Sequence, residues 1–381
     1  MAGLFKYGPR EIIKNHVHQA IPCLDLITSK HFKKDTLLRK LLIKLAQRLA
    51  LCSMKVRIAA WRYQRGPRIL LDHLSAENAT TATQNVPILN DLKAASLPEE
   101  GDEISDEIEQ VLGILIDHLR DKDTISRWMA AKGIGRICNR LNFDMADQVV
   151  SSIIEMLQED IELEPGQQIK DVDVSITNSS TWHGACLALA ELTRRGLLLP
   201  DRLYEAVPWV LRALTFEQRK GTYSLGTNVR DAACYVFWSV ARAYEGHVIS
   251  PFAQELAEAL VVVSLTDREV SIRRAASAAF QENAGRHGLF PHGIDVITTA
   301  DYFAIGNRAN CFLNIALKLA SYDAYRLPII NHLLAHSLSH WDLSIRHLTA
   351  KSLCLLAEKF PSDEFTAKSI PGLVIYNICI F

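Results

Sequence analysis

The sequence lacks the residue patterns that mark metal-held, redox-active or membrane-spanning proteins. None of its eight cysteines forms a Cys-x-x-Cys motif, and the closest two, Cys354 and Cys379, stand 25 positions apart, which argues against a zinc ribbon or a redox site. No apolar run reaches the roughly 18 residues of a membrane span, and the N-terminus lacks the apolar stretch of a signal peptide. We therefore expect a cytoplasmic protein that has no transmembrane segment and keeps its thiols buried and unpaired.

Aromatic residues and turn-forming residues are also scarce. Aromatics make up 8% of the 381 residues, and the chain has 18 glycines and 13 prolines. Apolar residues nevertheless reach 49%, which is enough to fill a large core. Strands favour aromatic and β-branched residues, whereas helices favour alanine and leucine, so this composition predicts a helical protein.

Charge is distributed unevenly, although the formal net charge is only -1. Residues 1–70 contain 15 Lys and Arg against three acids, so this segment carries +12 and the remainder must carry -13. Its basic residues interleave with leucines at helical spacing, which predicts an amphipathic helix with a solvated basic face. An acidic protein partner is the alternative, and we do not expect the chain to bind nucleic acid.

A basic residue followed by small residues recurs along the chain. Clear copies are centred on Arg57, Arg127, Arg230, Arg273 and Arg346, and weaker copies on His183 and Arg308. From Arg127 onward, successive copies are separated by 56, 47, 43, 35 and 38 positions. A period of about 40 residues with two helices each is typical of HEAT and armadillo proteins. We therefore predict an all-α HEAT/armadillo-type solenoid of about seven helical hairpins.

Three aspartates precede expected helices, and an arginine follows each of them by four to six residues. An aspartate at this position can accept hydrogen bonds from the unpaired N–H groups at a helix start. The small residues after each arginine allow a neighbouring helix to approach closely. We assign a structural role in the repeat to six residues, which are Asp123, Arg127, Asp267, Arg273, Asp342 and Arg346.

Helical periodicity and turn residues divide the chain. We expect helices over 36–51, 54–64, 104–119, 124–140, 145–158, 181–195, 201–214, 228–244, 250–264, 270–284, 307–320, 325–338 and 342–359. We expect basic helical repeats over 1–74, a polar and acidic disordered insertion over 75–107, and the main array over 108–365, interrupted by a polar insertion at 158–180. The last part, 366–381, is an apolar tail.

The motifs that could suggest an enzyme have simpler structural interpretations. Gly133-Ile134-Gly135 lies in a helical pattern, and Cys138 stands where a dinucleotide fingerprint needs a third small residue, so we expect close helix packing. The segment 221–226 has the wrong spacing for a nucleophile elbow and is expected to be a loop between repeats. His287 and His292 lack a third ligand, and no acid–base–nucleophile set is evident. We therefore predict no catalytic residue, no metal site and no cofactor.

The segments between repeats are better candidates for partner contacts, because 281–295 and 298–308 contain side chains that a spacer does not need. Phe290, Tyr302 and Phe303 are expected either to fill the core of an irregular repeat or to form part of a partner surface. Our candidate partner-binding residues are Arg230, Asp231, Arg286, Phe290, Asp301, Tyr302, Asn307 and Arg308.

Long stretches of the chain closely resemble the tubulin-folding cofactor D (tubulin-specific chaperone D) family. The resemblance runs from about residue 6 to 365 and includes LRKLLIKLAQRL, AAWRYQRG, KDTISRWMAAKGIGRI, WHGACLALAELTRRGLLLP, GTNVRDAACYVFW, RRAASAAFQENAGRHGLFPHGIDVITTADYFAIGNRANCF and HWDLSIRHL. Proteins of this family are about three times longer, so we expect an internal fragment or a truncated isoform, with a tail from Ser369 that does not match the family.

The resemblance implies a non-enzymatic chaperone of the cytoplasm and cytoskeleton. Family members bind β-tubulin after the cytosolic chaperonin, assemble α/β-tubulin heterodimers with cofactors C and E, and contribute to stimulating GTP hydrolysis by tubulin. They are regulated by a small Arf-like GTPase. The arginine associated with stimulating hydrolysis belongs to cofactor C, so no catalytic residue is carried over. The alternative is a generic HEAT-repeat scaffold for transport or signalling complexes.

Overall fold

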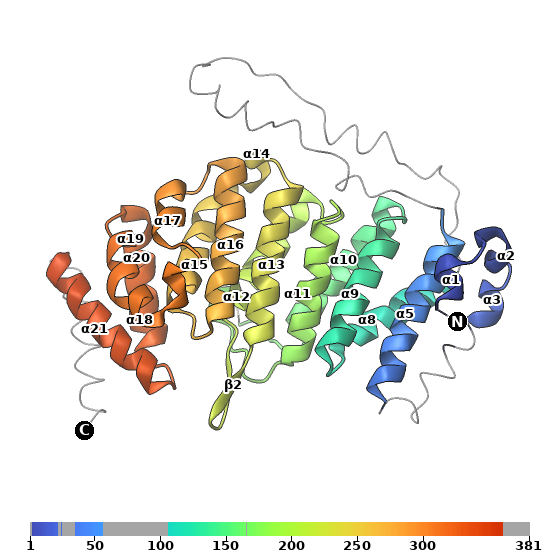
Figure 1. Ribbon diagram of the computed structural model, residues 1–381, viewed down its shortest axis with the longest axis horizontal. Coiled ribbons are helices and arrows are strands. Elements are labelled where there is room, and N and C mark those ends of the chain that lie inside the picture. The colour runs from blue at the N-terminus through green and yellow to red at the C-terminus, as the bar shows by residue number, and fades with distance from the viewer. Residues whose placement is uncertain (1, 22–23, 25–34, 56–105, 165, 361–381) are drawn as a thin grey trace, which may run out of the picture. The chain divides into compact units, whose positions relative to one another are not determined.

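The computed structural model describes all residues except 1, 22–23, 25–34, 56–105, 165 and 361–381 (Figure 1). Residues 56–64 of the helix expected at 54–64, the acidic insertion up to residue 105 and the apolar tail therefore lie outside the described residues. Met54 itself has an extended backbone at the end of the preceding helix. The chain divides into two compact units. The first comprises Met1–Glu155 and Glu191–Leu199, and the second comprises Met156–Ala190 and Pro200–Phe381.

The first unit is helical throughout its described residues. Its helices are α1 (Leu4–Tyr7), α2 (Arg10–Lys14), α3 (Val17–Ala20), α5 (Thr36–Ser53), α8 (Asp106–Asp117) and α9 (Thr124–Cys138), and a 3-10 turn η4 (His118–Arg120) follows α8. Two further helices, α10 (Phe143–Gln158) and α11 (Ser179–Thr193), contribute residues to both units. Aspartates begin two of the long helices: Asp35 accepts from the Leu37 amide at 2.8 Å, and Asp123 accepts from the Ser126 amide at 2.8 Å.

Gly133 and Gly135 are buried inside α9, where a Cβ atom would stand closer to its neighbours than an ordinary van der Waals contact. A Cβ atom at Gly133 would stand 3.1 Å from Leu115 Cδ1, and one at Gly135 would stand 3.1 Å from the Glu191 carbonyl oxygen. Close packing therefore explains both glycines, which confirms the packing interpretation over a phosphate loop.

The expected solvated basic face of residues 1–70 is only partly present among the described residues. Arg39 pairs with Asp121 at 2.8 Å, and Lys40 pairs with Asp123 at 3.3 Å. The Arg10 guanidinium donates hydrogen bonds to the carbonyl oxygens of Leu51 and Cys52. Arg39 and Lys40 thus connect α5 to the turn before α9, and Arg10 connects α2 to the end of α5. The interpretation as a merely solvated face is therefore wrong for these three cations.

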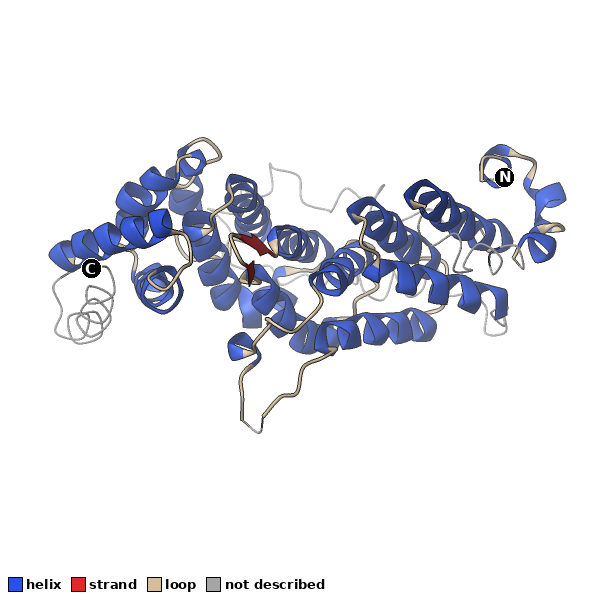
Figure 2. Cartoon of the chain, turned by 90° about the horizontal axis from the view of Figure 1, so that it is seen from below, coloured by secondary structure: helices blue, strands red, loops and turns tan. Residues whose placement is uncertain are grey.

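The second unit repeats a pair of helices joined by a turn. Its helices are α12 (Leu203–Leu214), α13 (Thr227–Ala243), α14 (Gly246–Ile249), α15 (Ala253–Thr266), α16 (Val270–His287), α17 (Gly293–Thr299), α18 (Arg308–Asn310), α19 (Ala316–Leu319), α20 (Asp323–His332) and α21 (Leu343–Lys359). Short 3-10 turns are η5 (Ile169–Asp171), η6 (Pro200–Arg202), η7 (Ser250–Phe252) and η8 (Ala304–Gly306), and π-turns are η9 (Cys311–Ile315) and η10 (Leu333–Ser337). The described residues are thus overwhelmingly helical, as expected (Figure 2).

The first helix of each pair packs against the second, and second helices of successive pairs pack together, above all α13 with α16 (Figure 1). Apolar side chains from both members fill the interior, including Trp182, Phe237, Leu260, Ile272 and Phe312. A single pair could not bury its apolar face alone, so stacking of pairs supplies the core.

A two-stranded antiparallel hairpin replaces the expected loop at 221–226. Its strands are β1 (Gln218–Lys220) and β2 (Tyr223–Leu225), with Gln218 opposite Leu225. The buried Gln218 amide donates to the carbonyl oxygens of Val174 at 2.5 Å and Thr177 at 2.7 Å, so it fixes the end of the polar segment 158–180. The loop prediction was wrong because three-residue strands are too short to show an alternating pattern.

One run within the described residues, Gly246–Thr266, is long and apolar enough to cross a membrane. It comprises α14, η7 and α15, and 56% of its apolar window is buried inside the protein. Such burial is typical of a core helix in a folded domain.

Candidate functional site

Four arginines brace the turns before their own helices in the same way. Each guanidinium donates to the backbone carbonyl oxygens of the residues six and five positions earlier. These residues lie in the turn before the helix, where the carbonyl oxygens need a hydrogen-bond donor from outside the regular helix. The donors with their acceptors are Arg127 with Asp121 and Lys122, Arg273 with Asp267 and Arg268, Arg326 with Ala320 and Ser321, and Arg346 with His340 and Trp341. Arg326 was missed at the sequence level, because no small-residue pair follows it.

Asp267 does not occupy the N-cap position of α16 that the sequence predicted for it. The residue that begins α16 is Glu269, which makes no side-chain cap, so the prediction that Asp267 caps this helix is wrong. Asp267 instead accepts a 2.6 Å hydrogen bond from the Arg230 guanidinium and a 2.8 Å bond from the Glu269 amide. Burial raises the pKa of Asp267 despite the opposing effect of Arg230.

Arg230 is buried and is engaged on both sides. It bonds the Phe216 carbonyl oxygen at 2.8 Å as well as Asp267, and only 6% of its surface is exposed. It therefore connects the turn before α13 to the turn before α16 and is not available to a partner. The assignment of Arg230 to a partner surface is corrected on this ground.

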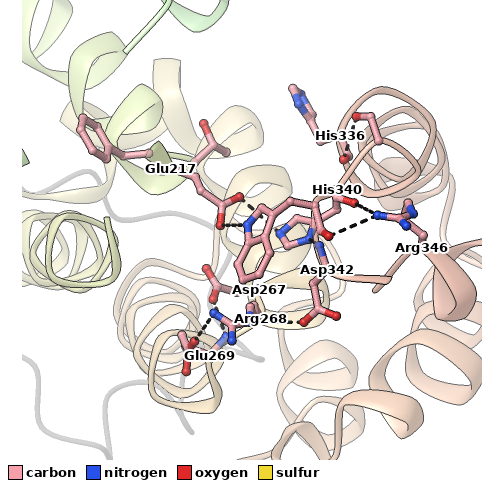
Figure 3. Close-up of polar contacts among 12 residues, drawn as sticks. Glu217, Asp267, Arg268, Glu269, His336, His340, Asp342 and Arg346 are labelled. Carbon is pink, nitrogen blue, oxygen red and sulfur yellow. Dashed lines mark hydrogen bonds and ion pairs between the residues drawn. The ribbon is translucent and has the colours of Figure 1, made fainter. Parts of the chain in front are cut away.

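A second polar junction connects the turn after α12 with the turn before α21 (Figure 3). The Trp341 indole N–H donates to Glu217 Oε1 at 2.9 Å, and His340 Nε2 lies 3.3 Å from Glu217 Oε2. Burial acts to raise the pKa of Glu217, but hydrogen bonds from His340 and Trp341 outweigh it and lower this pKa to about 2. Glu217 is therefore ionised at neutral pH.

Arg268 extends this junction. Its guanidinium lies 4.6 Å from the centre of the Trp341 ring and 3.3 Å from Asp342 (Figure 3). Arg308 also approaches Asp342, at 3.3 Å. Asp342 also accepts from the Ser344 amide at 2.9 Å and so begins α21, as the sequence indicated. Three turns far apart in sequence are joined here by charged hydrogen bonds.

The segment 300–308, which we call the aromatic loop, is held to α16 by its backbone. Arg274 Nε donates to the Tyr302 carbonyl oxygen at 3.2 Å, and Ser277 donates to Ala300 at 3.2 Å. Arg273 bonds the Ile305 and Gly306 carbonyl oxygens at 2.8 and 2.9 Å. The loop is therefore fixed at several points along its length.

The aromatic loop presents two aromatic side chains to solvent. Phe303 is 84% exposed and Tyr302 is 55% exposed, and Arg274 lies 3.9 Å from the Tyr302 ring centre. Asp301 Oδ1 accepts from the amides of Phe303 and Ala304 at 2.7 and 2.8 Å, which fixes the backbone of the exposed pair. Two adjacent exposed aromatic side chains on a hydrogen-bonded backbone make this loop a candidate for a protein contact.

The other candidate residues are divided between the two ends of α16. Asn307 and Arg308 belong to the aromatic loop, where Asn307 accepts from the Asn310 amide and begins α18. Arg286 lies in the last turn of α16, about 20 Å from Arg273 along the helix axis, and pairs with Glu282. The eight candidates therefore do not form one surface.

Phe290 and Asp231 differ in exposure. Phe290 is 4% exposed and its ring lies 5.0 Å from that of Phe280, so it fills the core and its assignment to a partner surface is corrected. Asp231 is the fifth residue of α13 and is exposed.

The described residues do not gather metal-ligating groups, and they bury most of their thiols. They contain no group of three or more metal-ligating side chains, and His287 and His292 make separate contacts, with the Ala241 carbonyl oxygen and the Tyr322 ring. Burial raises the pKa of the Cys138 and Cys186 thiols to about 12, which keeps them protonated and unreactive.

Comparisons with known proteins agree with the repeat architecture. A family model described as tubulin-specific chaperone D-like, ARM repeats, matches residues 37–294. Tubulin-specific chaperone D of Dictyostelium discoideum is 43% identical over 333 residues, which cover 86% of this chain and 22% of that protein. Tubulin-folding cofactor D of Schizosaccharomyces pombe is 31% identical over 333 residues, covering 87% of this chain and 28% of that protein. The chain thus spans about a quarter of the length of these curated relatives.

Among solved structures, the karyopherin Kap121p bound to Ste12p matches with a TM-score of 0.38 at 13% identity, covering 96% of this chain and 36% of that one. Kap121p bound to Nup53p gives the same TM-score and identity. A likeness this low supports no inference about function.

Proposed function

Because the chain belongs to the tubulin-specific chaperone D family, we propose that it is the part of a tubulin-folding chaperone that binds β-tubulin. Two named relatives and the stacked helix pairs of the second unit support this proposal. A repeat array exposes an extended surface, which suits a partner as large as a folding intermediate of tubulin.

The finer steps follow from the family and belong to the proposal. The chain acts in the cytoplasm after the chaperonin and takes part in assembly of the α/β-tubulin heterodimer together with cofactors C and E. It contributes to GTP hydrolysis by tubulin only within that assembly, and a small Arf-like GTPase regulates it. No residue of the chain is proposed to perform chemistry itself.

The observation that carries the proposed contact is the exposure of Phe303 on a loop held by its own backbone. A loop whose backbone is already ordered loses less conformational entropy on binding than a flexible one. Tyr302 and Phe303 therefore form the proposed apolar contact, with Asp301, Asn307 and Arg308 as its polar rim. Asp231 and Arg286 remain proposed contacts outside the aromatic loop.

The test is binding of purified tubulin to the 381-residue chain and to a Tyr302→Ala/Phe303→Ala variant. We expect the variant to bind at least tenfold more weakly, because exposed aromatic anchors at interfaces contribute about 2 kcal/mol or more. Leu327→Ala on α20 is the matched control, since Leu327 is 52% exposed and apolar but lies outside the aromatic loop. Unchanged tubulin binding by the double variant would reject the contact, and absence of tubulin binding by the unaltered chain would favour a generic scaffold.

A further inference from the structure

The solvent-facing side of α13 carries aromatic residues where a central helix would be expected to carry polar ones. Most of α13 is buried, and the positions that are not buried recur at helical spacing. Apart from the residues at the two helix ends, they form one stripe, which we call the α13 stripe, consisting of Asp231, Tyr235, Trp238 and Arg242.

The side chains of the α13 stripe hold one another in place. The Tyr235 and Trp238 rings are stacked with centroids 6.0 Å apart, and Arg242 lies 4.7 Å from the Trp238 ring centre. Glu282 of α16 receives Arg242 at 3.0 Å and Arg286 at 2.5 Å. The half-buried aromatic pair is therefore ordered before any partner arrives, which lowers the entropic cost of binding.

The neighbouring helix α16 presents small side chains beside the stripe. Asn283 donates to the Phe237 carbonyl oxygen at 3.1 Å, and this bond fixes α16 against α13. The outward positions Ser271, Ala278 and Gly285 of α16 are exposed. Small residues next to bulky ones let another helix approach closely, as ridges pack into grooves.

Charge selects the chemistry of the partner at this surface. At this end of the surface the guanidinium groups of Arg242 and Arg286 share the single carboxylate of Glu282. A carboxylate on a partner would complete this cluster through charge-assisted hydrogen bonds.

We propose that the α13 stripe and the adjoining face of α16 bind an acidic amphipathic helix of a partner protein. The apolar side of that helix lies on Tyr235, Trp238 and Ala278, and its carboxylates reach Arg242 and Arg286. The spacing of the stripe matches the way in which one helix contacts another. This surface is separate from the aromatic loop, and the proposal does not require that the partner be tubulin.

The test uses the full 381-residue chain and two fluorescein-labelled synthetic peptides of about 20 residues, long enough to form a helix. One carries leucines at helical spacing with glutamates on the opposite face, and the other has lysine in place of each glutamate. Fluorescence anisotropy should show at least tenfold tighter binding of the acidic peptide. Trp238→Ala should weaken this binding tenfold or more, and Arg242→Glu should abolish it.

Two matched controls separate this surface from general stickiness. Tyr204→Ala removes an aromatic residue that is 64% exposed on α12, and Lys318→Glu reverses an exposed charge on α19. Both should bind the acidic peptide as the unaltered chain does. Circular dichroism establishes that each variant is folded, and Arg242→Glu, which alters an exposed side chain, keeps the test decisive if Trp238→Ala unfolds. Equal binding of the two peptides, or wild-type affinity of folded Arg242→Glu, would overturn the proposal.

Discussion

The Trp341 indole donates a 2.9 Å hydrogen bond to the carboxylate of Glu217, a residue that precedes it by 124 positions. The same carboxylate lies 3.3 Å from His340, so two adjacent residues of one turn converge on an acid in another. The contact joins the turn after α12 to the turn before α21 and makes the second unit depend on an interaction that local sequence cannot reveal.

Removal of either partner should therefore destabilise the second unit. Trp341→Phe keeps an aromatic ring but removes the donor, and Glu217→Gln keeps the shape but removes the charge. Each should lower the free energy of unfolding by about 1–3 kcal/mol, the range for a hydrogen bond to a charged group. Urea unfolding of both single variants and the double variant gives the coupling energy, which should be at least about 0.5 kcal/mol. Strict additivity would show that the contact contributes no coupling.

Arg273 should be far more important for stability than its neighbour Arg274. Arg273 is 2% exposed and donates to four carbonyl oxygens, those of Asp267, Arg268, Ile305 and Gly306. Arg273→Met leaves buried acceptors unpaired and should cost about 3 kcal/mol or more. Arg274→Met removes a cation–π contact and a single exposed hydrogen bond and should cost about 1 kcal/mol. Thermal unfolding followed by circular dichroism compares the two, and equal losses would contradict the bracing role.

Gly226 should tolerate no side chain. Its φ is 130°, and a Cβ atom there would stand 2.3 Å from the Phe216 carbonyl oxygen, which already receives Arg230. Gly226→Ala should thus cost about 3 kcal/mol or more, because backbone strain and a steric clash act together. Gly166→Ala is the matched control, since φ is also positive, +87°, but no atom stands within 4 Å. It should cost about 1 kcal/mol, and a similar loss for both variants would contradict the clash.

Acid should destabilise the protein through His332. Burial, together with nearby His336 and His340, lowers the pKa of His332 from 6.5 to about 3. His332 is therefore protonated near pH 6.5 in the unfolded chain but only near pH 3 in the folded chain. Because the unfolded state binds the additional proton, the free energy of unfolding falls as pH decreases from 6.5 to 3. His332→Asn should flatten the dependence of the melting temperature on pH between 6.5 and 4.5, above the range in which Glu217 titrates. An unchanged slope would show that other groups control it.

The thiols of the described residues should differ sharply in reactivity. Cys354 is exposed, whereas Cys52, Cys138, Cys186, Cys234 and Cys311 are buried. Brief treatment of the native chain with a maleimide, followed by peptide mass spectrometry, should modify Cys354 and spare these five, because a thiol must be accessible and ionised to react. Labelling after denaturation is the control. Rapid native modification of Cys138 or Cys186 would contradict their burial.

Local spacing was sufficient to predict most of the described helices and two of their caps. Asp123 and Asp342 begin helices as expected, because a cap involves residues two or three positions apart. The same rule failed for Asp267, whose carboxylate is drawn to Arg230 of the preceding pair. A tertiary ion pair between buried groups outweighed a local cap, and nothing in the sequence around residue 267 signals that partner.

The candidate site was only partly predictable for a related reason. The segment 298–308 was identified because it contains large side chains that a simple connecting loop does not require. Which of these side chains are exposed depends on three-dimensional packing, which the sequence does not show. Phe290 and Phe303 look equivalent in sequence, yet Phe290 is buried against Phe280 while Phe303 is exposed. Glu217 was missed altogether, because its partners are brought to it by the stacking of helix pairs and not by any motif.

Polar contacts between helix pairs limit how far the pairs of the second unit can be exchanged. Each pair is completed by a group from another: Arg230 by Asp267, Arg308 by Asp342, and Glu217 by Trp341. Excision of the pair α15–α16 would leave Arg230 buried without its acid and would remove the Arg268 that lies on Trp341. Although the sequence repeats, each helix pair makes polar contacts that depend on particular residues of another pair. Insertion or deletion of a whole repeat would therefore require compensating substitutions in the neighbouring pairs.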